Sequence, residues 1–253
     1  MSLCDDELQT AVTFNESGKS PFFLVCDHAG NFLPRRVGTL GLNVQELESH
    51  IAWDIGAAAV TRFMADELDA FAVLQTCSRL VIDCNRPPTA EDSIAVYSEV
   101  TDIPANRMIT QAERERRLNE TFLPYHARIR TELDRRLKEG MSTVLVALHS
   151  FTPVFKGNHR PWHVGLLYNR DARLAKPMID LLRRDDLLIV GDNQPYNVSD
   201  DSDYTIPVHG ERRGLLHIEI EIRQDLIMGE DGQRLWAKRL AETLTLSAKA
   251  LLT

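Results

Sequence analysis

Short runs of apolar residues alternate along the chain with longer stretches in which apolar residues recur at helical spacing. Most runs are rich in valine, leucine and isoleucine without strict polar alternation, which is typical of strands covered on both faces. The runs predict strands at Phe22–Cys26, Phe71–Thr76, Leu80–Asp83, Thr143–Leu148, Val164–Tyr168, Leu187–Val190 and His217–Ile222. The longer stretches predict helices at Gln45–Leu68, Gln111–Glu139, Asp171–Arg183 and Gln233–Leu252. In the second of these helices, Pro124 predicts a kink and Gly140 a stop.

The alternation of strands with helices predicts a mainly parallel sheet with helices on both faces. No repeat, low-complexity tract or flexible linker divides the chain, so we expect a single domain over residues 1–253. Polar segments rich in turn residues adjoin the strands at Asn85–Ala105, Phe151–Trp162 and Asp192–Arg213. Ligands of open α/β sheets bind beyond the carboxyl ends of the strands, so these segments are expected to form the walls of a site.

Composition narrows the class of protein. The 253 residues are 43% hydrophobic and 26% charged, which argues against disorder. A formal net charge of −8 disfavours a nucleic acid or an anionic membrane as the main partner. No apolar run approaches the ~20 residues of a transmembrane helix, and Met1–Glu7 lacks the pattern of a signal peptide. Cys4, Cys26, Cys77 and Cys84 form no CxxC pair and indicate reduced thiols, so a cytoplasmic location is expected.

Three polar clusters directly follow predicted strands, at Asp27–Asn31, Asp83–Pro87 and His149–Ser150. A single histidine in such a place is more often a hydrogen-bonded core or rim side chain than a ligand. Two of them, His28 and His149, favour a metal site, because neutral imidazole is the usual zinc donor and a strand end holds it rigidly. Neither an HExxH nor a His-x-His spacing supports this reading.

The segment His217–Arg223 alternates polar residues with isoleucine. As a strand it places Glu219 and Glu221 on one face and the isoleucines on the other. A surface edge strand with solvated charges is one interpretation. The other is a pair of carboxylates that repel each other, which raises the pKa of one and suits it to general-base work.

Charged residues near these clusters are further candidates. Asp54 lies in an apolar stretch of a predicted helix, where it is either a cap or ion-pair partner, or a metal ligand. Arg79 and Arg86 flank the Asp83–Pro87 cluster, where they could hold a substrate carboxylate or polarise a carbonyl.

Nucleophilic catalysis has weaker support. Cys26 adjoins Asp27-His28, which makes a cysteine amidase conceivable, but an apolar strand position usually holds an inert packed thiol. Ser150 beside His149 is a similarly weak Ser/His candidate. The chain has no GxSxG, GxGxxG or Walker A motif.

Several blocks of sequence, taken in order, resemble the N-formylglutamate amidohydrolase family over nearly the whole chain. The first and last blocks are Val25–Asn31 and Glu221–Leu226. Those between them are Trp53–Gly56, Arg79 with Ile82–Pro87, Leu148–Pro153, Gly191–Tyr196 and Tyr204–Pro207. The family in turn is similar to zinc carboxypeptidases and aspartoacylases. This resemblance implies a three-layer α/β/α sandwich with a central mixed, mostly parallel sheet of about eight strands.

The resemblance also implies roles for individual residues. His28 and His149 match the zinc-binding histidines of that group, with one Zn²⁺ per chain. The acidic ligand that usually stands three residues after the first histidine is replaced by Asn31 here, and Asp54 is the candidate in its place. Glu221 matches the general base.

Five more residues complete the expected site. Arg79 matches the arginine that polarises the carbonyl, and Asn85-Arg86 matches the pair that binds the substrate carboxylate. Glu219 and Ser150 are expected to contact the substrate.

The expected reaction is hydrolysis of an N-acyl amide on an acidic amino acid. N-formyl-L-glutamate, cleaved to formate and glutamate, is the substrate that the resemblance implies, and with it a place in histidine degradation. The partner is then a small anionic N-acyl amino acid, and the protein a monomer or homodimer that binds neither nucleic acid nor membrane. The alternatives are a zinc hydrolase of another N-acyl amino acid or peptide, and a non-catalytic binding protein on the same scaffold.

Overall fold

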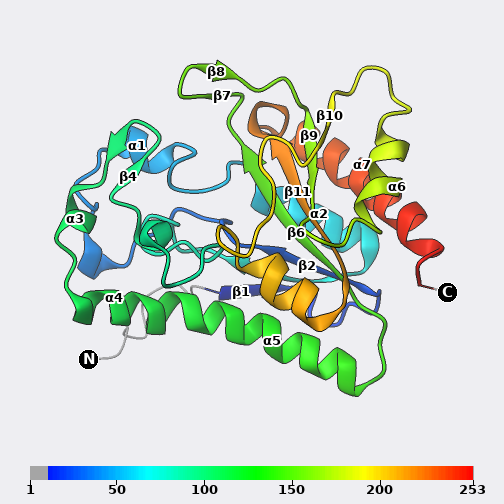
Figure 1. Ribbon diagram of the computed structural model, residues 1–253, viewed down its shortest axis with the longest axis horizontal. Coiled ribbons are helices and arrows are strands. Elements are labelled where there is room, and N and C mark those ends of the chain that lie inside the picture. The colour runs from blue at the N-terminus through cyan, green and yellow to red at the C-terminus, as the bar shows by residue number, and fades with distance from the viewer. Residues whose placement is uncertain (1–10, 253) are drawn as a thin grey trace.

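The computed structural model describes residues 11–252, which are organised around one mixed sheet (Figure 1). Its strands lie in the order β1-β3-β2-β6-β11-β9-β10. They span Ala11–Phe14 (β1), Phe22–Cys26 (β2), Phe71–Gln75 (β3), Val144–Phe151 (β6), Val164–Leu167 (β9), Val190–Asp192 (β10) and Leu216–Arg223 (β11). The sheet is mostly parallel, since only the β1–β3 and β9–β11 pairings are antiparallel. Cys4 and the Met1–Glu7 segment lie outside the described residues.

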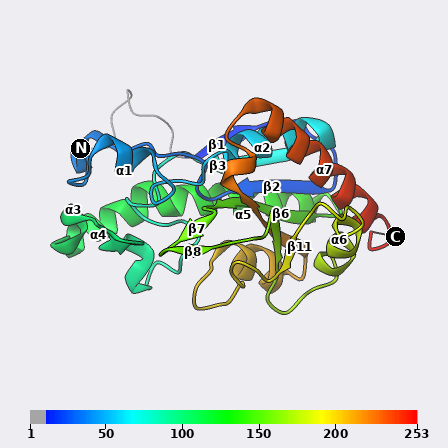
Figure 2. The same cartoon turned by 90° about the horizontal axis from the view of Figure 1, so that it is seen from above.

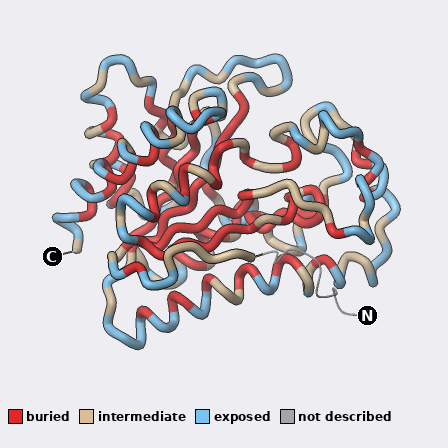
Figure 3. Tube along the Cα trace, turned by 180° about the vertical axis from the view of Figure 1, so that it is seen from behind, coloured by how far each residue is buried: buried red, intermediate tan, exposed pale blue. Residues whose placement is uncertain are grey.

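Helices cover both faces of the sheet, as the alternating pattern predicts (Figure 2). Three helices cover one face: α2 (Ala57–Leu68), α6 (Ala175–Leu182) and α7 (Glu230–Lys249). The opposite face is covered by α5 (Leu123–Lys138). Alternate residues of the central strands face the two layers, so the strands are buried along their length (Figure 3). The predicted α/β/α architecture is confirmed, with seven strands in the described part of the chain where about eight were expected.

The smaller elements lie in the connections. Three short helices are α1 (Val44–Glu48), α3 (Pro104–Arg107) and α4 (Gln111–Arg117). Two small hairpins pair β4 (Tyr97–Ser98) with β5 (Thr101–Asp102) and β7 (Val154–Phe155) with β8 (Asn158–His159). In the part of the chain that the structure describes, no helix combines the length and the apolarity that a membrane span requires.

The predicted helix at Gln45–Leu68 is wrong in its middle. Residues 49–56 form an irregular turn between α1 and α2, and Asp54 belongs to this turn, not to a helix. Gly56 enters α2 with a positive φ of 82°, and a Cβ there would lie 2.3 Å from the carbonyl oxygen of Ile227. The interruption lets the backbone N–H of Asp54 donate to the His28 carbonyl at 3.0 Å, which brings the carboxylate beside the end of β2.

The predicted strand at Leu80–Asp83 is also wrong. The Ser78 hydroxyl accepts from the Leu80 N–H at 3.2 Å, and the backbone carbonyl of Ser78 accepts from the Val81 N–H at 3.0 Å. The chain therefore turns here. Leu80 is buried in a small separate core, which explains the apolar pattern. The polar cluster that begins at Asp83 therefore lies in a loop.

Two other boundaries differ from prediction. β6 continues to Phe151, so His149 and Ser150 lie within a strand and not after it. Of the predicted strand Leu187–Val190, only Val190 belongs to β10, and Leu187 is 84% exposed. The predicted helix at Gln111–Glu139 becomes α4, a π-helical turn at Leu118–Phe122 and α5. Pro124 stands in the first turn of α5, where no intrahelical N–H is needed.

Candidate active site

A cavity of about 480 Å³ opens beyond the carboxyl ends of the parallel strands β2, β6 and β11. Its wall includes residues from all three polar segments that the sequence predicts around a site, among them Asn85, Phe155 and Asp203. Strand ends supply the deeper groups, including His28, His149 and Glu221. The prediction of a site at this edge of the sheet agrees with the structure.

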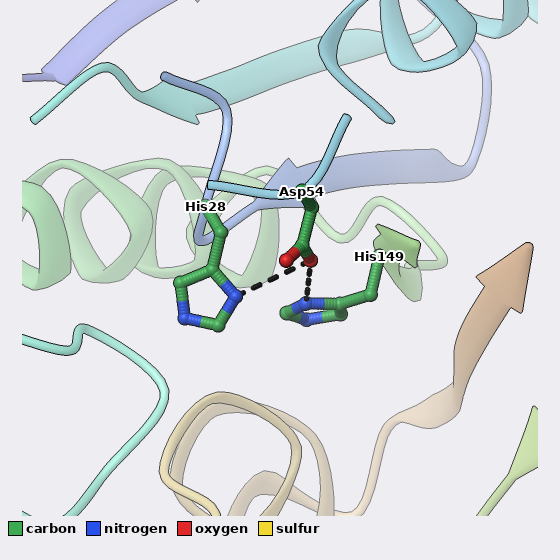
Figure 4. Close-up of side chains that lie close together, drawn as sticks. All are labelled: His28, Asp54 and His149. Carbon is green, nitrogen blue, oxygen red and sulfur yellow. Dashed lines mark hydrogen bonds and ion pairs between the residues drawn. The ribbon is translucent and has the colours of Figure 1, made fainter. Parts of the chain in front are cut away.

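His28, Asp54 and His149 form a buried cluster in the cavity (Figure 4). One oxygen of Asp54, Oδ2, lies 3.3 Å from Nδ1 of His28 and 2.9 Å from Nδ1 of His149. One possible ligand atom from each residue lies within 4.8 Å of the others. The three residues that sequence analysis names as metal ligands are therefore close enough to hold a metal ion together.

Each histidine of the cluster is held by a second carboxylate on its far side. Nε2 of His28 donates to Oδ1 of Asp83 at 2.7 Å, and Nε2 of His149 donates to Oδ2 of Asp27 at 3.1 Å. Histidines that bind metals commonly donate their other ring N–H to a carboxylate in this way. The contacts leave both Nδ1 atoms facing Asp54, so the donor set fits a metal ion bound by two nitrogens and one oxygen.

The charges of the cluster also suit a cation. Burial alone would lower the pKa of His149, but its hydrogen bonds to Asp27 and Asp54 raise that pKa well above the ordinary value. Burial opposes the ionisation of Asp54 as well, yet the two histidines hold its pKa below the usual range. Positive charge is thus stabilised at this point of the protein, as a divalent ion requires.

Arg79 is attached to the same cluster. It donates to Oδ2 of Asp83 from Nη2 at 2.7 Å and from Nε at 3.1 Å, and its Nη1 lies 3.4 Å from Oδ1 of Asp54. Burial lowers the pKa of the Arg79 guanidinium, but the carboxylates of Asp83 and Asp54 raise it by a larger amount. The pKa therefore lies above its ordinary value, and Arg79 stays charged. Asp83 therefore joins a predicted metal ligand, His28, to the predicted carbonyl-polarising residue.

Glu219 and Glu221 both face the cavity from β11. β11 is an interior strand between β6 and β9, and the isoleucines of the segment pack in the core, so the edge-strand interpretation is wrong. Burial raises the pKa of Glu219 to about 8 and that of Glu221 to about 7. Oε2 of Glu221 is buried without a hydrogen-bond partner among the described residues. A carboxyl group in this state is suited to accepting a proton near neutral pH.

Asn85 and Arg86 line the cavity from the loop that contains Asp83, and the Asn85 N–H donates to Oδ1 of Asp83 at 2.8 Å. Oδ1 of Asn85 accepts from the backbone N–H groups of Tyr204 and Thr205 at 3.1 and 3.0 Å. Its Nδ2 lies 3.4 Å from Oδ1 of Asp203 and 3.4 Å from Oε2 of Glu219. Arg86 donates from Nη1 to the carbonyl of Ser202 at 2.6 Å.

Comparison with models of protein families shows which family the chain belongs to. The family model described as N-formylglutamate amidohydrolase matches residues 20–228. The chain belongs to the N-formylglutamate amidohydrolase family.

Solved structures support the family relationship at the level of the fold. A gene product from Agrobacterium tumefaciens is 38% identical, with a TM-score of 0.94 and 97% of each chain covered. The N-formylglutamate amidohydrolase from Ralstonia eutropha is 18% identical, with a TM-score of 0.71, covering 96% of this chain and 98% of that one. No curated protein sequence matches the chain.

In this member of the family, three residues that the sequence suggests as ligand or nucleophile are not placed for that role. Asn31 donates to the carbonyl of Leu47 at 3.0 Å and does not line the cavity, so the position is not a ligand. The hydroxyl of Ser150 lines the cavity but donates to the Ile55 carbonyl at 2.9 Å and not to His149. Cys26 is fully buried, which raises the pKa of its thiol to about 12 and makes it a poor nucleophile.

Three carboxylates, Asp27, Asp83 and Asp203, organise the site without an individual role predicted from the sequence. Asp27 and Asp83 lie in the clusters that the sequence shows, next to His28 and Asn85 in sequence, so proximity was a usable signal. Asp27 is further fixed by Tyr125 at 2.8 Å and Thr205 at 2.7 Å. Nothing in the sequence points to a role for Asp203, because its partner Asn85 is 118 positions away.

Proposed function

We propose that the protein is a zinc-dependent amidohydrolase that cleaves N-formyl-L-glutamate to formate and glutamate. The observation that carries the proposal is the buried His28–Asp54–His149 cluster, with Glu221 lining the same cavity in a member of this family. Two imidazole nitrogens and one carboxylate oxygen are a common set of protein ligands for a catalytic zinc ion.

The three ligands would hold the metal, and Asp27 and Asp83 would keep the two imidazoles oriented. When bound, zinc supplies Lewis-acid activation of a water molecule and of the amide carbonyl. Glu221 accepts the proton of the attacking water and delivers it to the departing amine, which its unpartnered oxygen and raised pKa favour.

Arginines supply the remaining positive charge. Arg79 is held beside the cluster by Asp83 and stabilises the negative charge that develops on the carbonyl oxygen. Asn85 and Arg86 bind a carboxylate of the substrate and fix its position relative to the metal end of the cavity. Glu219 and Ser150 line the same cavity and would contact the substrate there.

The test is a substrate panel with identified products. Purified protein should release equimolar formate and glutamate from N-formyl-L-glutamate, lose this activity with a chelator, and regain it with zinc. N-acetyl-L-glutamate, N-formyl-L-aspartate and a formyl dipeptide test the acyl group and the amino acid. Faster turnover of one of these would replace the proposed substrate but keep the reaction. Binding of every compound without turnover would contradict the enzyme assignment.

A further inference from the structure

Asn85 and Arg86, the pair proposed to bind a substrate carboxylate, already face a carboxylate of the protein itself. The two N–H groups that contact Asn85 Oδ1 fix the orientation of its amide, so Nδ2 is the donor that points to Asp203. Nη1 of Arg86 lies 3.8 Å from the same atom of Asp203, Oδ1. One oxygen of Asp203 thus lies where the pair would hold an anionic ligand.

The fold keeps Asp203 in this position. Its other oxygen, Oδ2, accepts from the backbone N–H of Ser199 at 3.0 Å and from the hydroxyl of Ser202 at 2.5 Å. The residue is 8% exposed and lines the cavity. The carboxylate is therefore oriented by a turn of its own segment.

Glu219 is the second carboxyl group that contacts Asn85, and it differs from Asp203 in its support. Glu219 stands on β11, between two paired strands, and burial favours its neutral form. Asp203 belongs to the irregular segment between β10 and the π-helical turn Ile206–Gly210. Both hydrogens of the Asn85 amide are directed at these two groups, so a ligand carboxylate can reach Asn85 only by replacing one of them.

We propose that Asp203 is a specificity-determining residue that competes with the substrate carboxylate for Asn85 and Arg86. The inference rests on the proposed function, because it assumes that this pair binds an anion. A ligand carboxylate must either replace Asp203 or bind beside it. Replacing Asp203 breaks its contacts with Asn85 and Arg86. Binding beside it places the ligand carboxylate next to the negative charge of Asp203. Asp203 therefore weakens binding of anionic ligands, and most strongly that of dianions.

The experiment measures binding, so it does not depend on turnover. Glutarate, a dicarboxylate without an amide to cleave, is titrated into the protein by calorimetry, with uncharged glutaramide as the reference ligand. Asp203→Asn keeps an oxygen for Ser199 and Ser202 but removes the charge. We expect it to bind glutarate about tenfold more tightly, with no change for glutaramide. Asp203→Ser, which also keeps an acceptor, should act in the same direction if the first variant folds poorly.

Asp92→Asn is the matched control. Asp92 also contacts Arg86, through Nε at 3.1 Å, but its side chain is 64% exposed and its charge is screened by solvent. It should change glutarate affinity much less than Asp203→Asn. Unchanged or weaker glutarate binding by both Asp203 variants would overturn the inference, as would an equal gain in the Asp92 control. Failure of the wild-type protein to hydrolyse N-formyl-L-glutamate would count against the proposed function alone.

Discussion

The cavity lining around His28, Asp54 and His149, here called the metal end, is held differently from the lining around Asn85, Arg86 and Asp203, here called the carboxylate end. At the metal end, His28 follows β2 directly and His149 lies in β6, and every ring nitrogen of the two histidines meets a carboxylate. At the carboxylate end, Asn85, Arg86 and Asp203 come from loops and touch at 3.4 to 3.8 Å. Strands position His149 and Glu221, and His28 stands just after β2, whereas Asp54 and Arg79 come from turns, as do the three residues of the carboxylate end. Changes at the first end should therefore alter turnover, and changes at the second end substrate affinity.

The largest effect is expected from His149→Ala. The variant loses one of two imidazole donors and leaves Asp27 and Asp54 without their shared partner. Zinc content should fall below that of the wild type, and formate release should drop about 10³-fold or more, since metal activation contributes several kcal/mol. Metal analysis and a formate assay measure the two quantities. His159→Ala, on the exposed strand β8, is the control and should change neither. A His149→Ala protein that binds zinc and releases formate like the wild type would contradict the assignment of His149 as a zinc ligand.

Glu221→Gln separates proton transfer from metal binding. The variant keeps the shape of the side chain, and Oε2 of Glu221 makes no hydrogen bond to the proposed ligands among the described residues. Its kcat should fall about 10²–10⁴-fold, the range for loss of a general base, while zinc content stays at the wild-type level. Steady-state kinetics of formate release and metal analysis on the same sample measure kcat and zinc content. A kcat close to that of the wild type would remove Glu221 from the mechanism.

Asp83→Asn tests the residue that joins His28 to Arg79. Zinc affinity should fall about 10–100-fold, as for other residues that orient metal-binding histidines, measured by competition with a chromophoric chelator. Because Arg79 also loses the charge of its main partner, kcat should stay reduced at saturating zinc. Asp27→Asn is the comparison, since Asp27 holds His149 but no arginine. Equal kcat values for the two zinc-saturated variants would contradict the link through Asp83.

Arg86→Lys tests the carboxylate end. Lysine keeps the charge but loses the planar set of donors that contacts Ser202, Asp203 and Asp92. We expect KM for N-formyl-L-glutamate to rise about tenfold, with kcat little changed. A fall in kcat at unchanged KM would contradict the assignment of Arg86 to substrate binding and not to turnover.

The smallest effect is the pH dependence. Burial raises the pKa of Glu221 to about 7, and only its ionised form accepts a proton. Activity should therefore be present above this pKa and fall as the pH drops through it. A profile of kcat/KM from about pH 5 to about pH 9 tests this. A profile flat down to about pH 5 would contradict a general base with a raised pKa.

Sequence patterns predicted the metal end better than the carboxylate end. His28 stands just after β2, and His149 and Glu221 lie in β6 and β11. The apolar runs of these strands are easy to recognise, and parallel strands bring their carboxyl ends together. Asp54 was placed in a helix that does not exist there, because the turn at residues 49–56 depends on Gly56 packing against Ile227. The apolar run at Leu80–Asp83 predicts a strand that is absent, because Leu80 is buried in a separate small core and Ile82 packs in the core beneath the sheet without pairing in it.

The contact of Asp203 with Asn85 could not be predicted. It joins two loops through side chains far apart in sequence, and neither loop carries a periodic pattern. The fold class and the three candidate ligands thus follow from local pattern and family resemblance. Asp27 and Asp83, which orient the two histidines, stand in polar clusters that the sequence shows, whereas the position of Asp203 emerges only from tertiary structure.

The central claim is that the His28–Asp54–His149 cluster binds the zinc ion that activates the protein toward N-formyl-L-glutamate. The most direct test is to strip the protein of metal, add zinc in small steps and record the rate of formate release after each addition. The account predicts that the rate starts near zero, rises in proportion to the added zinc and levels off at one zinc per chain. Full activity in the metal-free protein would contradict it.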